Sequence, residues 1–271
     1  MKEYTFDAKK IKDQLIQGIR DWFEVNGKGC MACVAMSGGK DSTIVAKLCV
    51  EALGRDRVIG IGMPDKGQGL NEADEIAEWM GIKFKKVNIG NIIPKIQIRI
   101  ERAFNDPLEE VVDYEPEEIT GDEENTFQLS NQAEQNIPPR LRMLILYAIS
   151  QSMNGRVIGT CNASENYIGY FTKYGDGASD FEPIAELTVH ELYQIGDELG
   201  IPKKWTYKIP SDDLPHSEPD NDKFERMGFN YEKLDNYLRL GTSGDEVADK
   251  AIEKMHRQNV FKLQPVKTIK I

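Results

Sequence analysis

The 271-residue chain is poor in positive charge. Its 34 Lys and Arg residues face 45 Asp and Glu residues, which gives a formal net charge of −11. Nucleic-acid binding needs basic side chains that neutralise phosphates, so this balance argues against a DNA or RNA partner. No apolar run approaches the roughly 20 residues that span a bilayer, and the N-terminus lacks a signal-peptide core. The sequence therefore predicts a cytoplasmic protein with neither a nucleic-acid nor a membrane partner.

Cysteine is also scarce, with four residues in the whole chain. That number does not make a disulfide framework in a chain of this size. Cys30 and Cys33 spell C-x-x-C, but a redox or zinc site would need both thiols at a turn. Here they flank a predicted strand, where residues three apart point to opposite faces, and no second pair follows at zinc-ribbon spacing. We interpret them as packed residues of a core strand.

The most informative stretch is Val-Ala-Met-Ser-Gly-Gly-Lys-Asp-Ser-Thr, residues 34–43. The apolar run 31–36 predicts a buried strand, and residues 42–53 predict a helix. A glycine turn between a strand and a helix N-terminus directs unpaired backbone N–H groups and the positive helix end at one place. Gly38 and Gly39 let the backbone approach a ligand closely, while Ser37, Lys40 and Ser42 add donors and a cation. This pattern indicates a phosphate site.

Asp41 is unexpected there because a carboxylate repels phosphate. It fits if it holds Mg²⁺, which is usually bound by one or two carboxylates together with substrate oxygens. The alternative is that Asp41 and Ser42 only cap the helix. Glu165 follows another predicted strand and a polar turn in the same way. It is therefore a candidate second metal ligand, or simply a Glu at a helix N-terminus.

Strands and helices alternate along the chain. This order predicts an α/β fold, a doubly wound parallel sheet flanked by helices, in one domain over 1–271 with C-terminal helices. The predicted strands are 31–36, 57–63, 82–89 and 156–160, and the predicted helices are 7–25, 42–53, 72–80, 91–104, 127–136, 139–153, 188–199, 231–240 and 245–256. Residues 106–124 form a strongly acidic loop, and 208–225 are a candidate lid over a site.

The motif Ser-Gly-Gly-Lys-Asp-Ser resembles the pyrophosphate loop of the ATP pyrophosphatase superfamily. Together with the chain's other motifs, this loop indicates that residues 7–257 resemble the ammonia-dependent NAD synthetases. The other motifs are Asn136-Ile-Pro-Pro-Arg140-Leu-Arg142, Gly159-Thr160-Cys-Asn-Ala-Ser-Glu165, Thr172-Lys-Tyr-Gly-Asp-Gly177, Lys208-Ile-Pro-Ser211, Gly228-Phe-Asn-Tyr-Glu-Lys-Leu-Asp235 and His256-Arg257.

The resemblance implies an adenine nucleotide alpha hydrolase-like fold and a homodimer. It implies a ligase that adenylates deamido-NAD with ATP and then forms NAD with ammonia, releasing AMP and pyrophosphate. By motif match, ATP would be bound by Ser37, Gly38, Gly39, Lys40, Asp41, Ser42, Thr160 and Ser211. Deamido-NAD would be bound by Arg140, Lys173, Asp180, His256 and Arg257. Asp41 and Glu165 would hold Mg²⁺, and Asp41, Lys173 and Ser211 would be the catalytic residues.

Two positions depart from the family pattern. Some members carry a lysine that touches ATP phosphate where this chain has Val189, and the lid has Lys223 and Phe224 in place of adjacent acidic residues. Three alternatives therefore remain. They are another amidating pyrophosphate-loop enzyme such as a GMP synthetase-like ATPase, a tRNA-modifying enzyme, which the acidic charge disfavours, and a nucleotide-binding sensor without catalysis.

Overall fold

The computed structural model of the chain describes residues 4–65, 69–105, 126–208 and 220–269. At its centre is a four-stranded sheet in the order β3-β2-β1-β4, in which every pair is parallel. The strands are β1 (Met31–Ala35), β2 (Val58–Gly62), β3 (Lys83–Lys86) and β4 (Gly155–Ile158). All four predicted strands are therefore confirmed, with the edge strand β3 shorter than the predicted 82–89 because it pairs only with β2.

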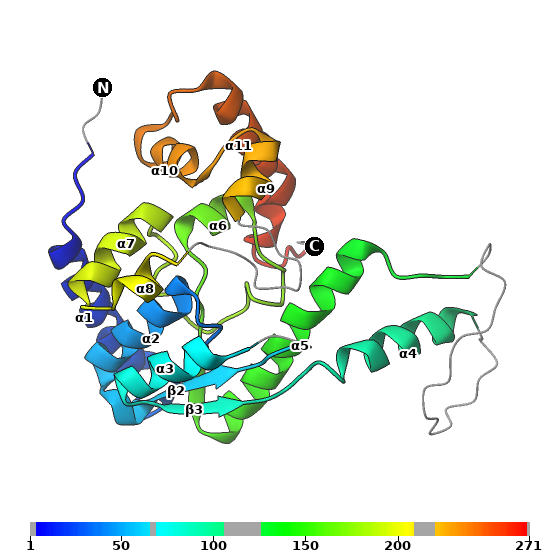
Figure 1. Cartoon of the computed structure of the whole chain (residues 1–271), viewed down its shortest axis with the longest axis horizontal. Helices are drawn as coiled ribbons and strands as arrows, with labels where there is room; N and C mark the ends of the chain where they lie inside the picture. Colours follow the sequence, from blue (N-terminus) through cyan, green and yellow to red (C-terminus); the bar gives the residue numbers. More distant parts are fainter. Residues whose placement is uncertain (1–3, 66–68, 106–125, 209–219, 270–271) are drawn as a thin grey trace.

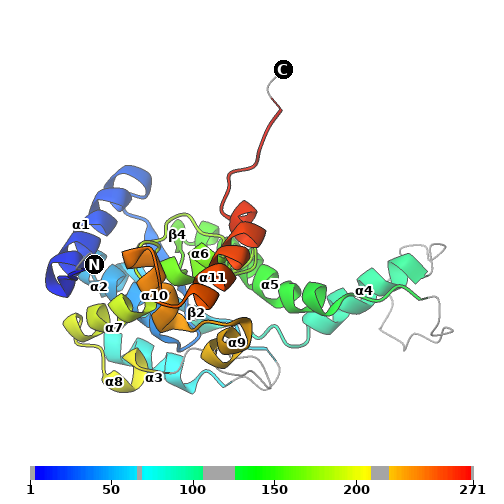
Figure 2. The same ribbon diagram turned by 90° about the horizontal axis from the view of Figure 1, so that it is seen from above.

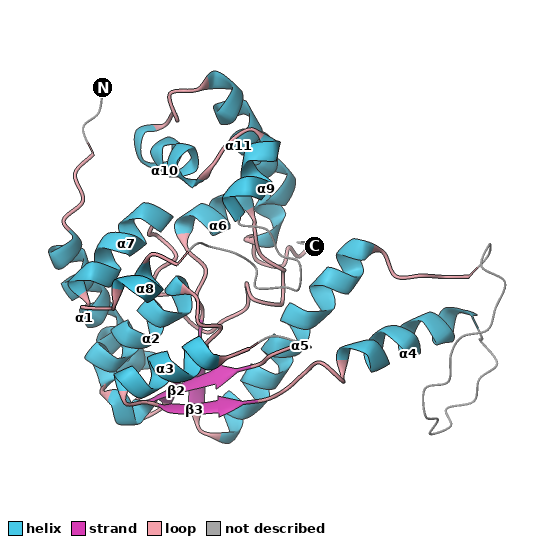
Figure 3. Ribbon diagram, in the orientation of Figure 1, coloured by secondary structure: helices cyan, strands magenta, loops and turns pink. Residues whose placement is uncertain are grey.

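Helices cover both faces of the sheet (Figures 1 and 3). One face packs against α1 (Ala8–Asn26), α2 (Lys40–Leu53), α3 (Asn71–Met80), α7 (Val189–Glu198) and α8 (Lys203–Thr206), and the other against α4 (Ile93–Asn105) and α5 (Asn131–Ser152). Because side chains alternate along a strand, Ala32 and Val34 of β1 join the first core and Cys33 joins the second. The doubly wound fold is confirmed, and so is the burial of Cys30 and Cys33 on opposite sides of the sheet.

The remaining helices form a third core beside the sheet. They are α6 (Ala163–Ile168), α9 (Asp220–Met227), α10 (Tyr231–Leu240) and α11 (Glu246–Asn259), which pack around Phe224, Phe229 and Tyr231. Two short 3₁₀ turns, η1 (Arg55–Arg57) and η2 (Val260–Lys262), precede β2 and follow α11. In Figure 1 α10 and α11 lie above the sheet, and Figure 2 shows α4 with the start of α5 extending away from the body of the molecule. The acidic loop 106–124 and most of the lid, 209–219, lie outside the described residues; 220–225 form the first turns of α9.

The prediction of two helices over 127–136 and 139–153 is wrong. One helix, α5, runs from Asn131 to Ser152 through Pro138 and Pro139. Proline in a helix interior removes an N–H donor and usually interrupts the helix, but Ser130 caps the start by accepting from the Ala133 N–H at 3.3 Å, and the apolar face beyond the prolines packs on the sheet. Arg140 therefore lies in the middle of a helix and not in a first turn.

We expect Gly169→Ala to lower the free energy of unfolding by about 2–4 kcal/mol. Gly169 ends α6 at φ +67°, and an added Cβ would lie 2.3 Å from Cβ of Asn259. Gly241→Ala is the matched control, because Gly241 ends α10 at φ +84° with no atom within 4 Å of an added Cβ. It should lose only the backbone preference, about 1 kcal/mol. Urea unfolding of both variants measures the difference, and equal losses would contradict the close α6–α11 contact.

Candidate functional site

The turn after β1 has the geometry of a phosphate cradle. Gly38 adopts φ +91°, and an added Cβ would lie 3.2 Å from Cβ of Glu72 and 3.3 Å from the backbone N of Ala73. The Ser37 hydroxyl accepts from the Gly39 N–H at 3.1 Å, and the Ser42 hydroxyl donates to the Gly39 carbonyl at 3.1 Å. Helix α2 begins at Lys40, two residues before the predicted start. Only glycine fits this φ and this spacing without strain, because the start of α3 occupies the space that a side chain would need.

Lys40 is buried and Asp41 is partly buried at the mouth of this turn. Lys40 is only 4% exposed. Its ammonium nitrogen lies 2.8 Å from Oδ2 of Asp41. The other oxygen, Oδ1 of Asp41, is buried and has no hydrogen-bond partner among the described residues. The alternative role of Asp41 as a cap is wrong, because the N-cap of α2 is Gly39 and no side chain caps it. A buried carboxylate oxygen without a partner is costly and fits a position that a cation or donor completes.

Glu165 faces the same place from the end of β4. It is the third residue of α6, and its carboxylate accepts from the Asn162 N–H at 3.1 Å in a capping box. Burial and the Asp41 carboxylate together raise the pKa of Glu165 to about 8, against the opposing effect of Lys40. Burial alone would lower the pKa of Lys40, but Asp41 and Glu165 outweigh it and the pKa is raised. The adjacent strands β1 and β4 thus bring Asp41 and Glu165 together. The alternative role predicted for Glu165, that of a Glu at a helix N-terminus, is also confirmed, because Glu165 caps the start of α6.

This donor set suits Mg²⁺. Two partly buried carboxylates, one of which has a buried oxygen without a hydrogen-bond partner among the described residues, leave most of the coordination shell to phosphate oxygens and water, as Mg²⁺ prefers. Within the described ranges there is no group of three or more His, Cys, Asp or Glu residues that could enclose an ion without substrate. The residues present therefore fit a divalent cation held jointly with a phosphate ligand.

The predicted substrate residues form a second group. The Arg140 guanidinium Nε donates to the Lys173 carbonyl at 3.3 Å, and Lys173 Nζ donates to the Phe261 carbonyl at 3.2 Å. Helix α5, the loop after α6 and the turn η2 meet at these contacts. Nδ1 of His256 lies 2.7 Å from the Tyr167 carbonyl, and the imidazole stacks on the Tyr167 ring at 4.2 Å.

The remaining predicted substrate and ATP residues do not join this group. Asp180 accepts from the Val157 N–H at 2.8 Å and from the Tyr147 hydroxyl at 3.3 Å, so its carboxylate fixes the loop to β4. Arg257 pairs with Glu253 on the exposed side of α11 and is not brought to the other substrate residues. Thr160 lies just beyond β4 and is partly exposed. Ser211 lies outside the described residues, and Val189 is buried in the third core.

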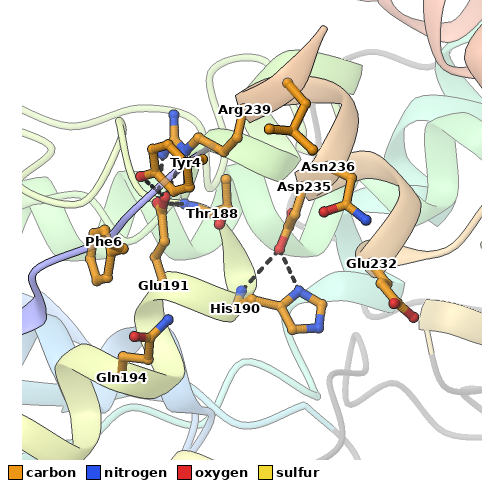
Figure 4. A pocket seen from close by; sticks show the side chains of 11 residues that line it. Tyr4, Phe6, Thr188, His190, Glu191, Gln194, Glu232, Asp235, Asn236 and Arg239 are labelled. Carbon is orange, nitrogen blue, oxygen red and sulfur yellow. Dashed lines mark hydrogen bonds and ion pairs between the residues drawn. The ribbon is translucent and has the colours of Figure 1, made fainter. Parts of the chain in front are cut away.

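A cavity of about 550 Å³ was not foreseen from the sequence. It lies between the N-terminal segment, α7 and α10, and Figure 4 shows the side chains around it. Arg239 holds the Glu191 carboxylate with both Nε and an amino nitrogen, at 2.6 and 2.5 Å, and the Tyr4 hydroxyl donates to the same carboxylate. The capping pattern Thr188-x-x-Glu191 was readable in the sequence, whereas the Arg239 partner was not.

We expect Arg239→Ala to lower the free energy of unfolding at pH 7 by about 3 kcal/mol, because it leaves the buried Glu191 carboxylate without its ion-pair partner. Burial acts to raise the pKa of Glu191, but the bonds from Arg239, Tyr4 and Thr188 outweigh it and lower the pKa below 4.5. The pair therefore stabilises the fold above pH 4.5, and its contribution is lost as pH falls through the lowered pKa.

The matched control is Lys233→Ala on the same helix. The Lys233–Asp245 pair is exposed, at 2.7 Å, and such pairs are worth roughly 0–1 kcal/mol. Denaturant unfolding at pH 7 and at pH 3 measures both variants. An Arg239→Ala deficit that persists undiminished at pH 3 would contradict the assigned ion pair.

Comparison with known proteins covers nearly the whole chain. A family model described as NAD synthase matches residues 12–270. The NH(3)-dependent NAD(+) synthetase of Archaeoglobus fulgidus is 34% identical over 91% of this chain and 90% of its own length. The NMN synthetase of Francisella tularensis superposes with a TM-score of 0.81 at 26% identity over 98% of this chain and 100% of that chain. The NH3-dependent NAD synthetase of Campylobacter jejuni, 24% identical, shares the fold with a TM-score of 0.70 over 98% and 100%.

Proposed function

The chain belongs to the NAD synthase family, and we propose that its site converts deamido-NAD, ATP and ammonia into NAD, AMP and pyrophosphate. The observation that carries this proposal is the buried Asp41 oxygen without a partner, placed at a glycine turn shaped for phosphate. ATP is the co-substrate of this family, and the carboxylate of the pyridine ring is the group that it activates. Nothing in the fold or the relatives favours a tRNA-modifying enzyme or a sensor.

Activation of the substrate requires that the α-phosphate of ATP be stabilised, because negative charge collects there as the carboxylate of the pyridine ring attacks. We assign the backbone N–H groups of the loop 37–42 to binding the phosphates. We assign Lys40 to stabilising the negative charge that collects on them. Asp41 and Glu165 would hold Mg²⁺, which supplies Lewis-acid stabilisation of phosphate oxygens when bound. Thr160 and Ser211 keep their predicted contacts to ATP. Lid residues 208–225 would keep water from the acyl-adenylate.

The substrate side of the proposal rests on Arg140 and Lys173. The Arg140 guanidinium contacts the Lys173 backbone in the loop that follows α6, and the Lys173 ammonium contacts the C-terminal turn η2. Two cations this close together suit an anionic dinucleotide. Asp180, His256 and Arg257 remain predicted substrate contacts, although Asp180 and Arg257 already pair within the chain. Lys173 could act in catalysis only after leaving the Phe261 carbonyl. Lys173→Met should therefore affect both turnover and substrate affinity.

We also propose a homodimer. Leu144 on α5 is 62% exposed, and Ala148, one turn further along, is exposed as well. Both residues lie on the part of α5 whose other face packs on the sheet. An apolar strip exposed there favours burial against a second copy. Light scattering at micromolar concentration should give the mass of two chains, and Leu144→Glu should give one. A monomeric wild-type protein would contradict the proposal.

One observation favours a second candidate substrate. The NMN synthetase structure superposes with a TM-score of 0.81, higher than the 0.70 of the Campylobacter NAD synthetase. The smaller acid, nicotinate mononucleotide, offers the same carboxylate. The test is pyrophosphate release by purified protein with ATP, Mg²⁺ and ammonium, with each acid in turn. We expect a higher kcat/KM with deamido-NAD than with the mononucleotide. The reverse result would identify the mononucleotide as the substrate. No pyrophosphate release with either acid would indicate a nucleotide-binding sensor without catalysis.

A further inference from the structure

His190 is held in a fixed orientation at the start of α7. Its Nδ1 lies 2.6 Å from Oδ2 of Asp235, and the same oxygen accepts from the His190 backbone N–H at 2.9 Å. Figure 4 shows Nδ1 turned toward Asp235 and the opposite edge of the ring turned away from it. The side chain is 49% exposed and lines the cavity between α7 and α10. One ring nitrogen is thus anchored while the other faces open space.

The anchor belongs to a buried network that reaches the proposed metal ligands. Oδ1 of Asp235 accepts from the Ser164 hydroxyl at 2.6 Å, and that hydroxyl accepts from the Val189 N–H at 3.2 Å. Ser164 immediately precedes Glu165 on α6. Three helices, α6, α7 and α10, are therefore joined at Asp235, so the His190 ring is held rigidly relative to Glu165.

Helix α7 packs against α2, the helix that begins at Lys40 directly after the glycine turn. The Lys40 charge acts to lower the pKa of His190, and the charges of Lys40 and Asp41 also act on Tyr193, one turn further along α7. The His190 and Tyr193 rings meet edge to face at 5.8 Å. The charge of Lys40 thus acts on both His190 and Tyr193.

We propose, on the basis of the ATP site assigned above, that His190 contacts the pyrophosphate portion of ATP. Nδ1–H donates to Asp235, and Nε2–H donates to a phosphate oxygen. Lys40 is already paired with Asp41 at 2.8 Å, so a second cationic donor would add to the charge that the phosphates meet. A hydrogen bond between an ionised donor and a phosphate is among the strong ones.

The charge state of His190 agrees with this role. The hydrogen bond to Asp235 raises its pKa, which burial and Lys40 oppose and the charges of Asp235 and Glu232 support. The groups that face the ring are Asp235 and Glu232 on α10, Lys40 on α2 and Tyr193 on α7. A bound phosphate would favour the imidazolium further, because it adds negative charge on the open side of the ring.

Calorimetric titration with magnesium pyrophosphate tests the contact without turnover. His190→Ala should bind this probe about tenfold more weakly or worse, the loss of one hydrogen bond to a charged group. Gln194→Ala is the control, since Gln194 lines the same cavity one turn along α7, and its affinity should match wild type. In steady-state assays, His190→Ala should raise KM for ATP and leave KM for the pyridine substrate unchanged.

His190→Gln separates the charge from the shape of the side chain. The ratio of wild-type to His190→Gln affinity should be larger at pH 6 than at pH 8.5, because the imidazolium is lost as pH rises, and the probe's own titration cancels in the ratio. Wild-type affinity in His190→Ala, or a ratio that does not change with pH, overturns the proposal while the ATP site stands. Failure of the wild-type protein to bind the probe at millimolar concentration overturns the ATP site as well. Thermal unfolding of each variant identifies a loss that is due to misfolding.

Discussion

Asp41→Asn is expected to lower ATP-dependent turnover by roughly three orders of magnitude while leaving the fold intact. The amide keeps the shape of the side chain but removes the charge that would hold Mg²⁺, and metal stabilisation of phosphoryl charge is worth several kcal/mol. Two effects on stability oppose each other. Neutralising Asp41 relieves its repulsion of Glu165, whose pKa burial and the Asp41 charge raise, but it also leaves the buried Lys40 ammonium without its partner at 2.8 Å.

Asp56→Asn is the matched control, because Asp56 is an exposed carboxylate just beyond the far end of α2. Pyrophosphate release and urea unfolding should be measured for both variants. Turnover of Asp41→Asn within about tenfold of wild type would remove Asp41 from the metal site. A fall in stability larger than that of the control would mean that the carboxylate is structural.

The second large effect concerns the nitrogen donor: ammonium should support NAD formation and glutamine should not. A glutaminase needs a cysteine whose thiolate is accessible and whose pKa is depressed. All four cysteines of this chain are buried. Burial raises the pKa of Cys33, of Cys49 to about 12, and of Cys161 well above its ordinary value. Each thiol is therefore inert and shielded from glutamine.

The measurement compares NAD formation with ammonium and with glutamine freed of contaminating ammonia, at saturating ATP, Mg²⁺ and deamido-NAD. Cys161→Ser is the informative control, because Cys161 lies between Thr160 and Glu165 in the candidate site and its Sγ is 3.6 Å from the Asp176 carbonyl. The variant should keep most of its ammonium-dependent rate. Comparable rates with both donors in wild type, abolished in Cys161→Ser, would require a glutaminase site at that cysteine.

The sequence could predict the features that short stretches determine. A strand, two glycines and a helix N-terminus specify the turn at Gly38 through local backbone geometry alone, and Glu165 follows its strand in the same way. Alternation of strands and helices was enough for the parallel sheet. The long helix α5 was misread because the rule that proline interrupts helices is local, whereas packing on the sheet sustains the helix through Pro138 and Pro139.

Contacts between distant segments could not be predicted. His190 meets Asp235 across 45 positions of sequence, and Arg239 meets Glu191 across 48. No periodicity encodes such pairs, because each depends on how α7 and α10 cross in the third core. His190 and Arg239 carried no local sequence signal beyond their own polarity. His190 in particular belongs to none of the motifs recognised in the sequence.

The position of the two carboxylates also has a consequence for folding. Asp41 and Glu165 lie on the helices that follow the neighbouring strands β1 and β4, yet β2 and β3 are synthesised between these strands. Parallel pairing over such a separation has a high contact order and is slow. The two-carboxylate site comes into existence only when β4 docks beside β1. Ligands that bind this site stabilise the chain with β4 docked and not the partly folded chain, so magnesium nucleotide would shift the population toward the completed sheet.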